Sequence, residues 1–462
     1  MSAINSCPEC LKKQQIIDRL IEENQSLKRK LKYQERKAKE GFFGSSTSSA
    51  KIPIKSNTDG GEECKPKGAR AGHQGNGRKS FAVGEADEVN RVCADAAGVC
   101  PDCGGPLEDK GFEERMVIDS ASVQARRILY RLGKRYCPRC RKVFQERAPG
   151  VLPRSLYGNQ LIATAVVMHY LYGIPLGKVS EQMGIGAGTL LEIFRRLAGL
   201  LETVPTRLIE EYRQSLVRHA DETPWRTEGQ NGYVWLFATE KISIFQFRAS
   251  RSGEIPRAIF GTACLPGMLI VDRYAAYNKV PCTLQYCYAH LSREVEDLGK
   301  EFPDSQEVQR FVATLVPLLS LAMGLRRQSL SDPQFYAKAK EVKSQILATI
   351  QSPAQHQGIR HIQDIFRDHP NRLYHWAENR DIPADNNLAE RDLRPTVIAR
   401  KVSFGSQSDA GARIRGTLMS VLYSLKKRGF DVAARLKSTL DELTKDATQN
   451  PYSPLFSRDS PP

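Results

Sequence analysis

The sequence has no long uninterrupted apolar segment. Its most apolar stretch, residues 311–325, contains Pro317 and is shorter than the roughly 20 apolar residues that a helix needs to cross a bilayer. The first ten residues, MSAINSCPEC, are polar and lack the apolar core of a secretory signal. We therefore expect a cytoplasmic protein without a membrane partner.

Acidic residues are also in short supply. The chain has 52 Asp and Glu against 68 Lys and Arg, which gives a formal net charge of +16. This excess favours a polyanionic partner, DNA or RNA before a membrane surface; a protein that is merely basic is the alternative. Hydrophobic residues make up 40% of the 462 residues, enough for a packed interior, and the length favours more than one domain.

The cysteines do not resemble a disulfide framework, because eleven is an odd number and a reducing compartment favours metal ligands or free thiols. Cys100, Cys103, Cys137 and Cys140 form two CxxC pairs. Two thiolates separated by two residues reach one tetrahedral Zn²⁺ from a tight turn. We predict a zinc ribbon within residues 91–150. Four protein ligands leave no open position on the ion, so this zinc would support folding or DNA contact rather than chemistry.

Two segments precede the ribbon. Residues 1–40 carry a heptad pattern with an Asn on its seam, which predicts either a parallel coiled coil or a solvated amphipathic helix; the seam is Ile17, Leu20, Asn24, Leu27 and Leu31. Residues 41–90 are rich in Gly, Ser and Lys and predict a flexible basic linker. Arg70, Arg78 and Lys79 are its candidate DNA contacts, and a solubilising linker is the alternative.

The remaining chain predicts a mixed α/β fold. Residues 151–205 read as helical, with a helix-turn-helix over 176–183, 184–188 and 189–197, or an ordinary helical hairpin. Strand-like runs follow within 206–300, so this region is expected to form the first part of a sheet with helices packed on it; the runs are 215–220, 233–237, 242–247, 268–272 and 284–288. Residues 301–380 predict a helical insertion, 381–447 the final part of the core with a helix from 386 to 394, and 448–462 a disordered tail.

Three carboxylates stand out in this region. Asp221 and Asp272 each end an apolar run, and Glu390 lies in DIPADNNLAERDLRP behind a helix start signal. Two Asp at strand ends and one Glu on a helix could gather oxygen ligands for Mg²⁺ or Mn²⁺. Each also has a plain interpretation: a strand-end turn for Asp221, a helix cap for Asp272, and an i,i+4 pair with Arg394 for Glu390.

Further polar residues flank these three. His290 and Arg293 follow a strand and are candidates to face a scissile phosphate, although a structural histidine is equally compatible with the pattern. Arg394, Arg400 and Lys401 are candidate phosphate contacts, with a solvated helix face as the alternative. The tryptophans are expected to pack in the core rather than to stack on bases; they are Trp225, Trp235 and Trp376.

Several segments together resemble the IS66 family of insertion-sequence transposases: GHQGNGR, the two CxxC pairs, HADETP, GYVWLF, VDRYAAYNK, CYAHLSRE, NNLAERDLRP and RKVSFGSQSDAGARI. The resemblance implies a DDE-type catalytic core on a ribonuclease-H-like sheet, with Asp221, Asp272 and Glu390 corresponding to the acidic triad. The chain departs from the family pattern at Arg273, where Gly is usual, and in CYAH, where CWAH is usual.

The same resemblance implies a function. Two Mg²⁺ or Mn²⁺ ions would cleave DNA at the element ends, and the freed 3′-OH ends would then attack target DNA. The expected partners are the terminal inverted repeats, the target, further copies of this chain and accessory proteins of the same element, all in a bacterial cytoplasm at the nucleoid. Two alternatives are open: a non-catalytic DNA-binding protein that uses the ribbon and helix-turn-helix, and a ribonuclease-H-like nuclease without strand transfer.

Overall fold

The computed structural model describes residues 148–446 and 448–457, together with 125–132, the backbone of 134–137 and 142–145, and six residues between 16 and 24. The chain divides into two units, Met1–Ile52 with Ala125–Pro462 and Pro53–Gln124. The second unit lies outside the described residues, and the sheet and its helices all belong to the first.

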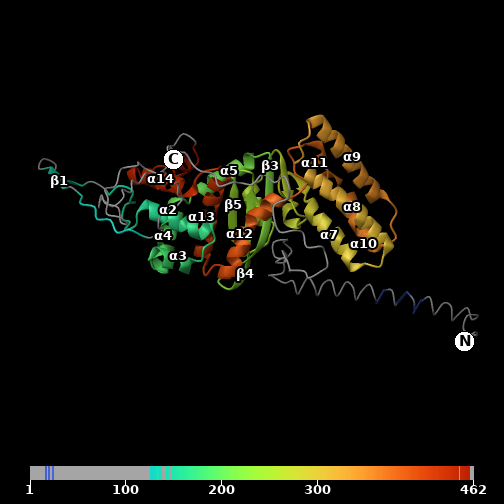
Figure 1. Cartoon of the computed structure of the whole chain (residues 1–462), viewed down its shortest axis with the longest axis horizontal. Helices are drawn as coiled ribbons and strands as arrows, with labels where there is room; N and C mark the ends of the chain where they lie inside the picture. The colour runs from blue at the N-terminus through green and yellow to red at the C-terminus, as the bar shows by residue number, and fades with distance from the viewer. Residues whose placement is uncertain are drawn as a thin grey trace, which may run out of the picture. The chain divides into compact units, whose positions relative to one another are not determined.

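A five-stranded mixed sheet forms the centre of the described region (Figure 1). Its order is β5-β4-β3-β6-β7, with β3, β4 and β5 antiparallel and β3, β6 and β7 parallel. Residues 234–238 are all buried, which is the pattern of a strand covered on both faces. The bounds are β3 Val217–Thr227, β4 Gln230–Ala238, β5 Ser243–Arg248, β6 Met268–Val271 and β7 Thr283–Tyr286.

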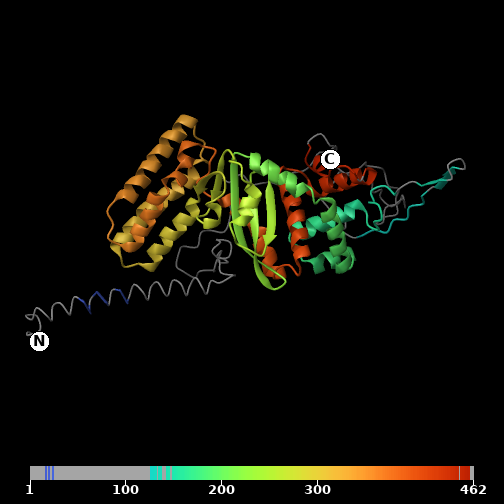
Figure 2. The ribbon, with the colours of Figure 1, turned by 180° about the vertical axis from the view of Figure 1, so that it is seen from behind.

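Helices cover the sheet, and the strands are seen from the other side in Figure 2. The first group packs on the sheet directly: α5 Val204–Gln214, α12 Asn387–Ser403 and α13 Asp409–Lys427. Along the chain, α6 Glu254–Phe260 follows β5, and η5 Ala275–Tyr277 follows β6. The three tryptophans, Trp225, Trp235 and Trp376, are almost fully buried, which confirms the prediction of core packing.

The edge strand β5 is closed by α13. Backbone N–H groups of Ser243 and Phe245 donate to the hydroxyls of Ser424 (3.1 Å) and Ser420 (2.9 Å). The helix comes this close because of Gly416, where a Cβ atom would lie 2.9 Å from the carbonyl oxygen of Phe245. An edge strand with open N–H groups invites pairing with another chain, so α13 both completes the core and protects this edge.

The helices before the sheet lie close to the predicted positions, in an arrangement that a helix-turn-helix and an ordinary helical hairpin share. They are α2 Asn159–Val166 with a π-helical continuation η4 Val167–Leu171, α3 Leu176–Met183 and α4 Ala187–Leu200. Gly184 ends α3 in the left-handed conformation, with φ of 65°. The first helix has the predicted bounds, whereas the second begins two residues earlier, at Ala187. This group packs against α13 and α14 Val432–Lys445.

The insertion is helical, as predicted. After α7 Tyr288–Glu301 it contains α8 Gln306–Leu325, α9 Asp332–Gln351, α10 Gln357–Asp368, η6 Pro370–Arg372 and α11 His375–Glu378. Helix α8 is longer than the apolar run 311–325 suggested, and by length and composition alone it could cross a membrane. It contains Pro317 and packs against α7 and α9, with Leu315 and Leu319 fully buried. A buried core helix satisfies the same criteria of length and composition.

Three predicted boundaries were wrong. Strand β3 continues past Asp221 to Thr227, because its second half pairs with β4. Helix α12 does not end at Arg394 but includes Pro395 and reaches Ser403; buried Val397 holds the later turns on the sheet. Part of the predicted disordered tail forms α15 Tyr452–Phe456, which packs on α14 with Leu455 and Phe456 buried.

The N-terminal predictions fall mainly outside the described residues. Six residues of the predicted heptad helix are described, and all are helical and exposed. Strands β1 Lys134–Cys137 and β2 Lys142–Gln145 pair antiparallel around the second CxxC pair. The basic linker with Arg70, Arg78 and Lys79 lies outside the described residues, as do Cys100, Cys103 and Cys140.

The edge closure can be tested with Ser420→Ala. The substitution leaves the buried N–H of Phe245 without its acceptor, so we expect a loss of about 1–3 kcal/mol of unfolding free energy, measured by urea denaturation. Ser344→Ala on α9 is the matched control, because its exposed hydroxyl bonds only to the Lys340 carbonyl of the same helix. Equal stability of the two variants would contradict the role of Ser420.

Candidate active site

Asp221 and Asp272 come to the same level of the sheet. In the parallel pair β3–β6, His219 is opposite Ile270, the last paired position. Two residues further along each strand are Asp221 and Asp272. Adjacent strands lie about 4.8 Å apart, so this register brings Asp221, inside β3, next to Asp272, which directly follows the carboxyl end of β6. The sequence predicted that Asp221 ends a strand. In the structure, Asp221 lies inside β3, at the point where β3 loses its pairing with β6.

Helix α12 brings Glu390 to the same side of the sheet. The amide of Asn386, at the start of α12, bonds to His219 (2.9 Å) and donates to the carbonyl of Ala220 (2.9 Å). Further along the helix, Arg400 donates to the carbonyl of Pro224 (2.5 Å). Alternate residues of a strand share one face, and Glu390 follows Asn386 by one helical turn. The contacts of Asn386 and Arg400 therefore fix α12 along β3 and bring Glu390 near Asp221.

The pKa of Asp221 reflects the negative charges close to it. Burial raises the pKa of Asp221 well above its usual range, and the negative charges of Glu222, Asp272 and Glu390 raise it further. The hydrogen bond from the backbone N–H of Glu222 opposes this shift in pKa only in part. A carboxyl group in such surroundings is costly to ionise unless a cation joins it.

Glu222 points to the opposite face of the strand, as expected for a neighbour of Asp221. One of its oxygens accepts from Arg251 (2.6 and 2.9 Å) and the other from the hydroxyl of Tyr277 (2.6 Å). Burial and the charge of Asp272 raise the pKa of Glu222 to about 7, although Arg251 and Tyr277 counteract the shift. Arg251 could not be singled out from the sequence, because the loop that carries it shows no motif. Tyr277 lies within the VDRYAAYNK segment, but the sequence did not show what its hydroxyl contacts.

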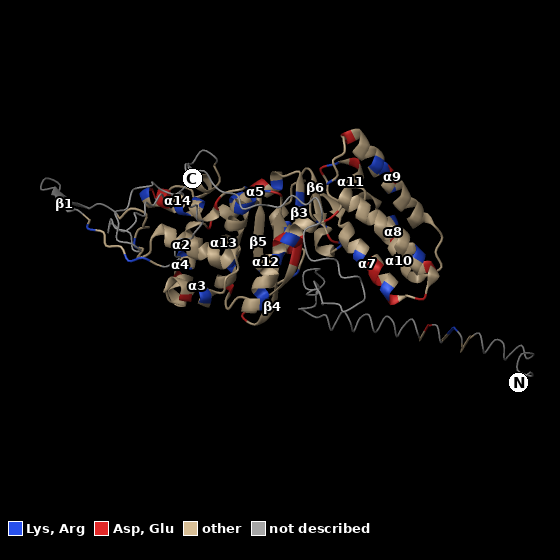
Figure 3. Ribbon diagram, in the orientation of Figure 1, with Lys and Arg blue, Asp and Glu red and all other residues tan. Residues whose placement is uncertain are grey.

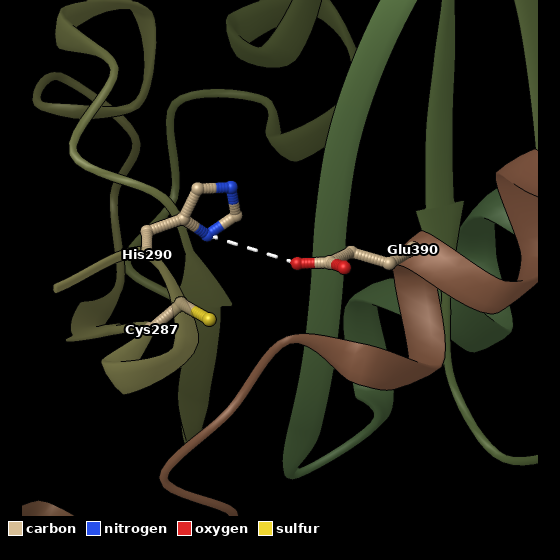
Figure 4. Close-up of side chains that lie close together, drawn as sticks. All are labelled: Cys287, His290 and Glu390. Atoms are coloured by element: carbon tan, nitrogen blue, oxygen red, sulfur yellow. Dashed lines mark ion pairs between the residues drawn. The ribbon is translucent and has the colours of Figure 1, made fainter. Parts of the chain in front are cut away.

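A second group also contains Glu390. The Sγ of Cys287, a ring nitrogen of His290 and a carboxylate oxygen of Glu390 all lie within 4.8 Å of one another (Figure 4). His290 Nδ1 is 3.8 Å from Glu390 Oε1, and Arg293 Nη2 is 4.0 Å from the same oxygen. The structure thus brings both predicted flanking residues, His290 and Arg293, to Glu390. Asp221 and Asp272 are not members of this tight group.

The side chain of Cys287 was missed from the sequence. Burial raises its pKa to about 12, and the charge of Glu390 adds to this rise. For His290, burial lowers the pKa, while the charges of Asp272 and Glu390 raise it. The spacing CYAH contained the signal, since a residue just before a helix and one in its first turn can face the same point.

The basic candidates divide by exposure. Arg394 and Lys401 are exposed on α12. Arg400 is buried, and its guanidinium is used in the contacts with Thr223 and Pro224. The unusual Arg273 forms an ion pair with Glu294 of α7.

A separate cavity is lined in part by the same strand and helix, β3 and α12. It has a volume of about 1390 Å³ and is also lined from the β4–β5 turn and the ends of α8 and α13. His219 and Arg391 line it, but Asp221, Asp272 and Glu390 do not. The three acids therefore lie outside this cavity.

Comparison with known families now gives the class of protein. Residues 154–414 match the model described as "Transposase IS66 family", and residues 98–141 match "zinc-finger binding domain of transposase IS66". The first match covers the sheet, the insertion and α12, so the protein is of the transposase class. The chain belongs to the IS66 family of transposases, and its zinc-finger domain supports a structural zinc and DNA binding.

Two relatives from Sinorhizobium fredii (strain NBRC 101917 / NGR234) are similar to this chain. "Uncharacterized protein y4qI" is 24% identical over 345 residues, covering 66% of this chain and 63% of the relative. "Uncharacterized protein y4hP" is 21% identical over 416 residues, covering 80% and 74%. The chain therefore spans less than two thirds of the first relative.

The electrostatic cost at Asp221 can be measured by stability. A carboxyl with a raised folded-state pKa stabilises the fold while protonated, and this contribution is lost as pH rises through that pKa; for Glu222 the window is from 4.5 to about 7. We expect Asp221→Asn to be more stable than the unchanged protein by about 0.5–2 kcal/mol at pH 8 without Mg²⁺ or Mn²⁺. The difference should shrink towards pH 4.5.

Thermal unfolding with and without added Mn²⁺ provides the second half of this test. Mn²⁺ should stabilise the unchanged protein more than Asp221→Asn. Asp368→Asn, an exposed residue at the end of α10, is the matched control and should follow the unchanged protein. A destabilised Asp221→Asn with a full response to Mn²⁺ would refute this account.

Proposed function

We propose that this protein is a DDE-type DNA transposase in which Asp221, Asp272 and Glu390 hold two Mg²⁺ or Mn²⁺ ions. The observation that carries the proposal is the buried Asp221, whose strongest charged neighbours are Glu222, Asp272 and Glu390. Three oxygen donors from β3, the end of β6 and α12 suit hard divalent ions. We infer that the five-stranded mixed sheet is the ribonuclease-H-like core that family membership implies.

The proposed chemistry is phosphodiester cleavage followed by strand transfer. Such a pair of ions, when bound, activates a water molecule and stabilises the departing 3′ oxygen. The negative charges around Asp221 make its ionised form unfavourable, and bound ions would neutralise that charge. Arg293, close to Glu390, is suited to hold a non-bridging phosphate oxygen. The freed 3′-OH would then attack target DNA in the same site.

The exposed face of α12 is the proposed surface for DNA next to the site. Its exposed residues are Asn387, Arg391, Arg394, Ile398, Lys401 and Val402, so every exposed charge on this helix is positive. Figure 3 colours the charged positions along the ribbon. The row begins beside Glu390 and follows the helix for about 15 Å (ten residues at 1.5 Å each). Of the two neighbouring candidates, Arg400 is buried and bonds to β3, whereas Lys401 is exposed at the surface.

Other DNA contacts are proposed for the N-terminal parts. The helix pair α3–α4, the zinc-finger domain with Cys100, Cys103, Cys137 and Cys140, and the basic linker with Arg70, Arg78 and Lys79 would bind the terminal inverted repeats. The heptad helix would join copies of this chain. Accessory proteins of the same element and a location at the bacterial nucleoid complete the proposal.

The catalytic assignment predicts a specific loss of activity. Asp221→Asn, Asp272→Asn and Glu390→Gln should each reduce Mg²⁺-dependent nicking of the element ends at least about 100-fold, with DNA binding retained in a gel-shift assay. Asp297→Asn, an exposed acid on α7, is the control and should nick normally. Nicking by all three variants would exclude the proposal. A pre-cut 3′ end offered with target DNA separates a transposase from a nuclease, since only a transposase joins the strands.

The DNA surface predicts a change in salt dependence. Each phosphate contact adds about 0.9 to the slope of log affinity against log salt, so replacing Arg391, Arg394 and Lys401 by Ala should reduce the slope by about 2.7. Lys340→Ala on the exposed face of α9 is the control and should leave the slope unchanged. An unaltered slope in the triple variant would show that DNA does not follow α12.

A further inference from the structure

The group formed by Cys287, His290 and Glu390 combines three different donors. Cys287 precedes α7, His290 lies in its first turn, and Glu390 comes from α12. Their sulfur, nitrogen and oxygen atoms all lie within 4.8 Å of one another. In Figure 4 the imidazole and the carboxylate face each other, and the sulfur lies on the same side. Sulfur and imidazole donors favour borderline ions such as Zn²⁺, whereas Mg²⁺ takes oxygen.

The sulfur of Cys287 is already arranged as an acceptor. It occupies the N-cap position of α7 and accepts a hydrogen bond from the backbone N–H of Asn386 (3.1 Å). An N–H donor and the N-terminal end of a 14-residue helix both favour negative charge on a sulfur. Burial outweighs these effects and raises the pKa of Cys287 to about 12, so a bound metal ion would have to displace the thiol proton.

The imidazole provides the second observation. His290 Nδ1 is buried and has no hydrogen-bond partner in the described part of the chain. A buried polar atom without a partner is costly, and here it faces the carboxylate of Glu390 at 3.8 Å, beyond hydrogen-bond distance. An ion between the two would be a partner for Nδ1. It would also neutralise the negative charge of the carboxylate next to the sulfur.

We propose that Cys287, His290 and Glu390 form a binding site for one Zn²⁺ ion, separate from the zinc-finger domain. Donors around a tetrahedral zinc lie roughly 3.5 Å apart, so small side-chain rotations close the group around an ion. The side chain of His290 keeps 25% of its surface exposed, which leaves the ion accessible for a fourth ligand. Because Glu390 is also a proposed ligand of the catalytic ions, this site would regulate their loading; that consequence alone rests on the proposed function.

The test measures zinc content and not activity. The unchanged protein, Cys287→Ser and His290→Ala are saturated with Zn²⁺, dialysed into zinc-free buffer containing Mg²⁺, and analysed by atomic absorption. We expect the unchanged protein to retain one zinc ion per chain more than either variant. Cys282→Ser is the matched control, because Cys282 is a partly buried free cysteine outside the group, and it should retain the full content.

Cobalt substitution gives an independent reading of the same site. The difference spectrum between the Co²⁺-loaded unchanged protein and Cys287→Ser should contain a thiolate-to-cobalt charge-transfer band, and the difference from Cys282→Ser should contain none. The zinc-finger cysteines are present in every variant and cancel. Equal zinc content in all folded variants, as judged by circular dichroism, overturns the proposal.

Asp221→Asn separates this inference from the proposed function. Asp221 lies outside the zinc group, so this variant should keep the additional zinc ion. If the variant keeps the ion and also nicks DNA, the proposed function fails while the zinc site stands. If nicking is lost but Cys287→Ser holds as much zinc as the unchanged protein, the zinc site fails while the proposed function stands.

Discussion

The repulsion among buried carboxylates at the β3–β6 junction is the constraint on which the described structure depends. The three charges that act most strongly on Asp221 are all negative, and Arg251 is bonded to Glu222 on the other face. A fold based on packing alone would gain by replacing one of these acids with a neutral residue. Their joint presence is the physical basis of the proposal that cations bind here in the working state, in a chain that belongs to a transposase family.

The scaffold around the acids serves to hold α12 in register. Asn386 bonds to β3 at one end of the helix and Arg400 at the other, so a shift of α12 along the sheet would break both contacts. This explains why the helix continues through Pro395, which lacks an N–H and ordinarily costs about 3 kcal/mol inside a helix. The carbonyl that loses its usual donor four residues on belongs to Arg391, an exposed residue.

The sequence predicted the parts of the fold that depend on local pattern. Apolar runs located all five strands, and the glycines after Met183 located the turn between α3 and α4. It failed where tertiary contacts override local signals: pairing with β4 extends β3, and packing on the sheet extends α12. Asp221 and Asp272 were predicted as site residues because each ends an apolar run, and Glu390 because it lies in a polar segment behind a helix start signal; these assignments stay predictions. Asn386, Cys287 and Tyr277 were not predicted, since only the folded chain shows what they contact.

Glu390 is shared by the two proposed metal sites. The catalytic proposal joins it to the oxygens of Asp221 and Asp272, which suit Mg²⁺, and the zinc proposal joins it to the sulfur of Cys287 and the imidazole of His290, which suit Zn²⁺. Under these two proposals the ions would compete for one side chain. The Asn386 and Arg400 contacts fix the register of α12 on β3, and so would set the geometry of that competition.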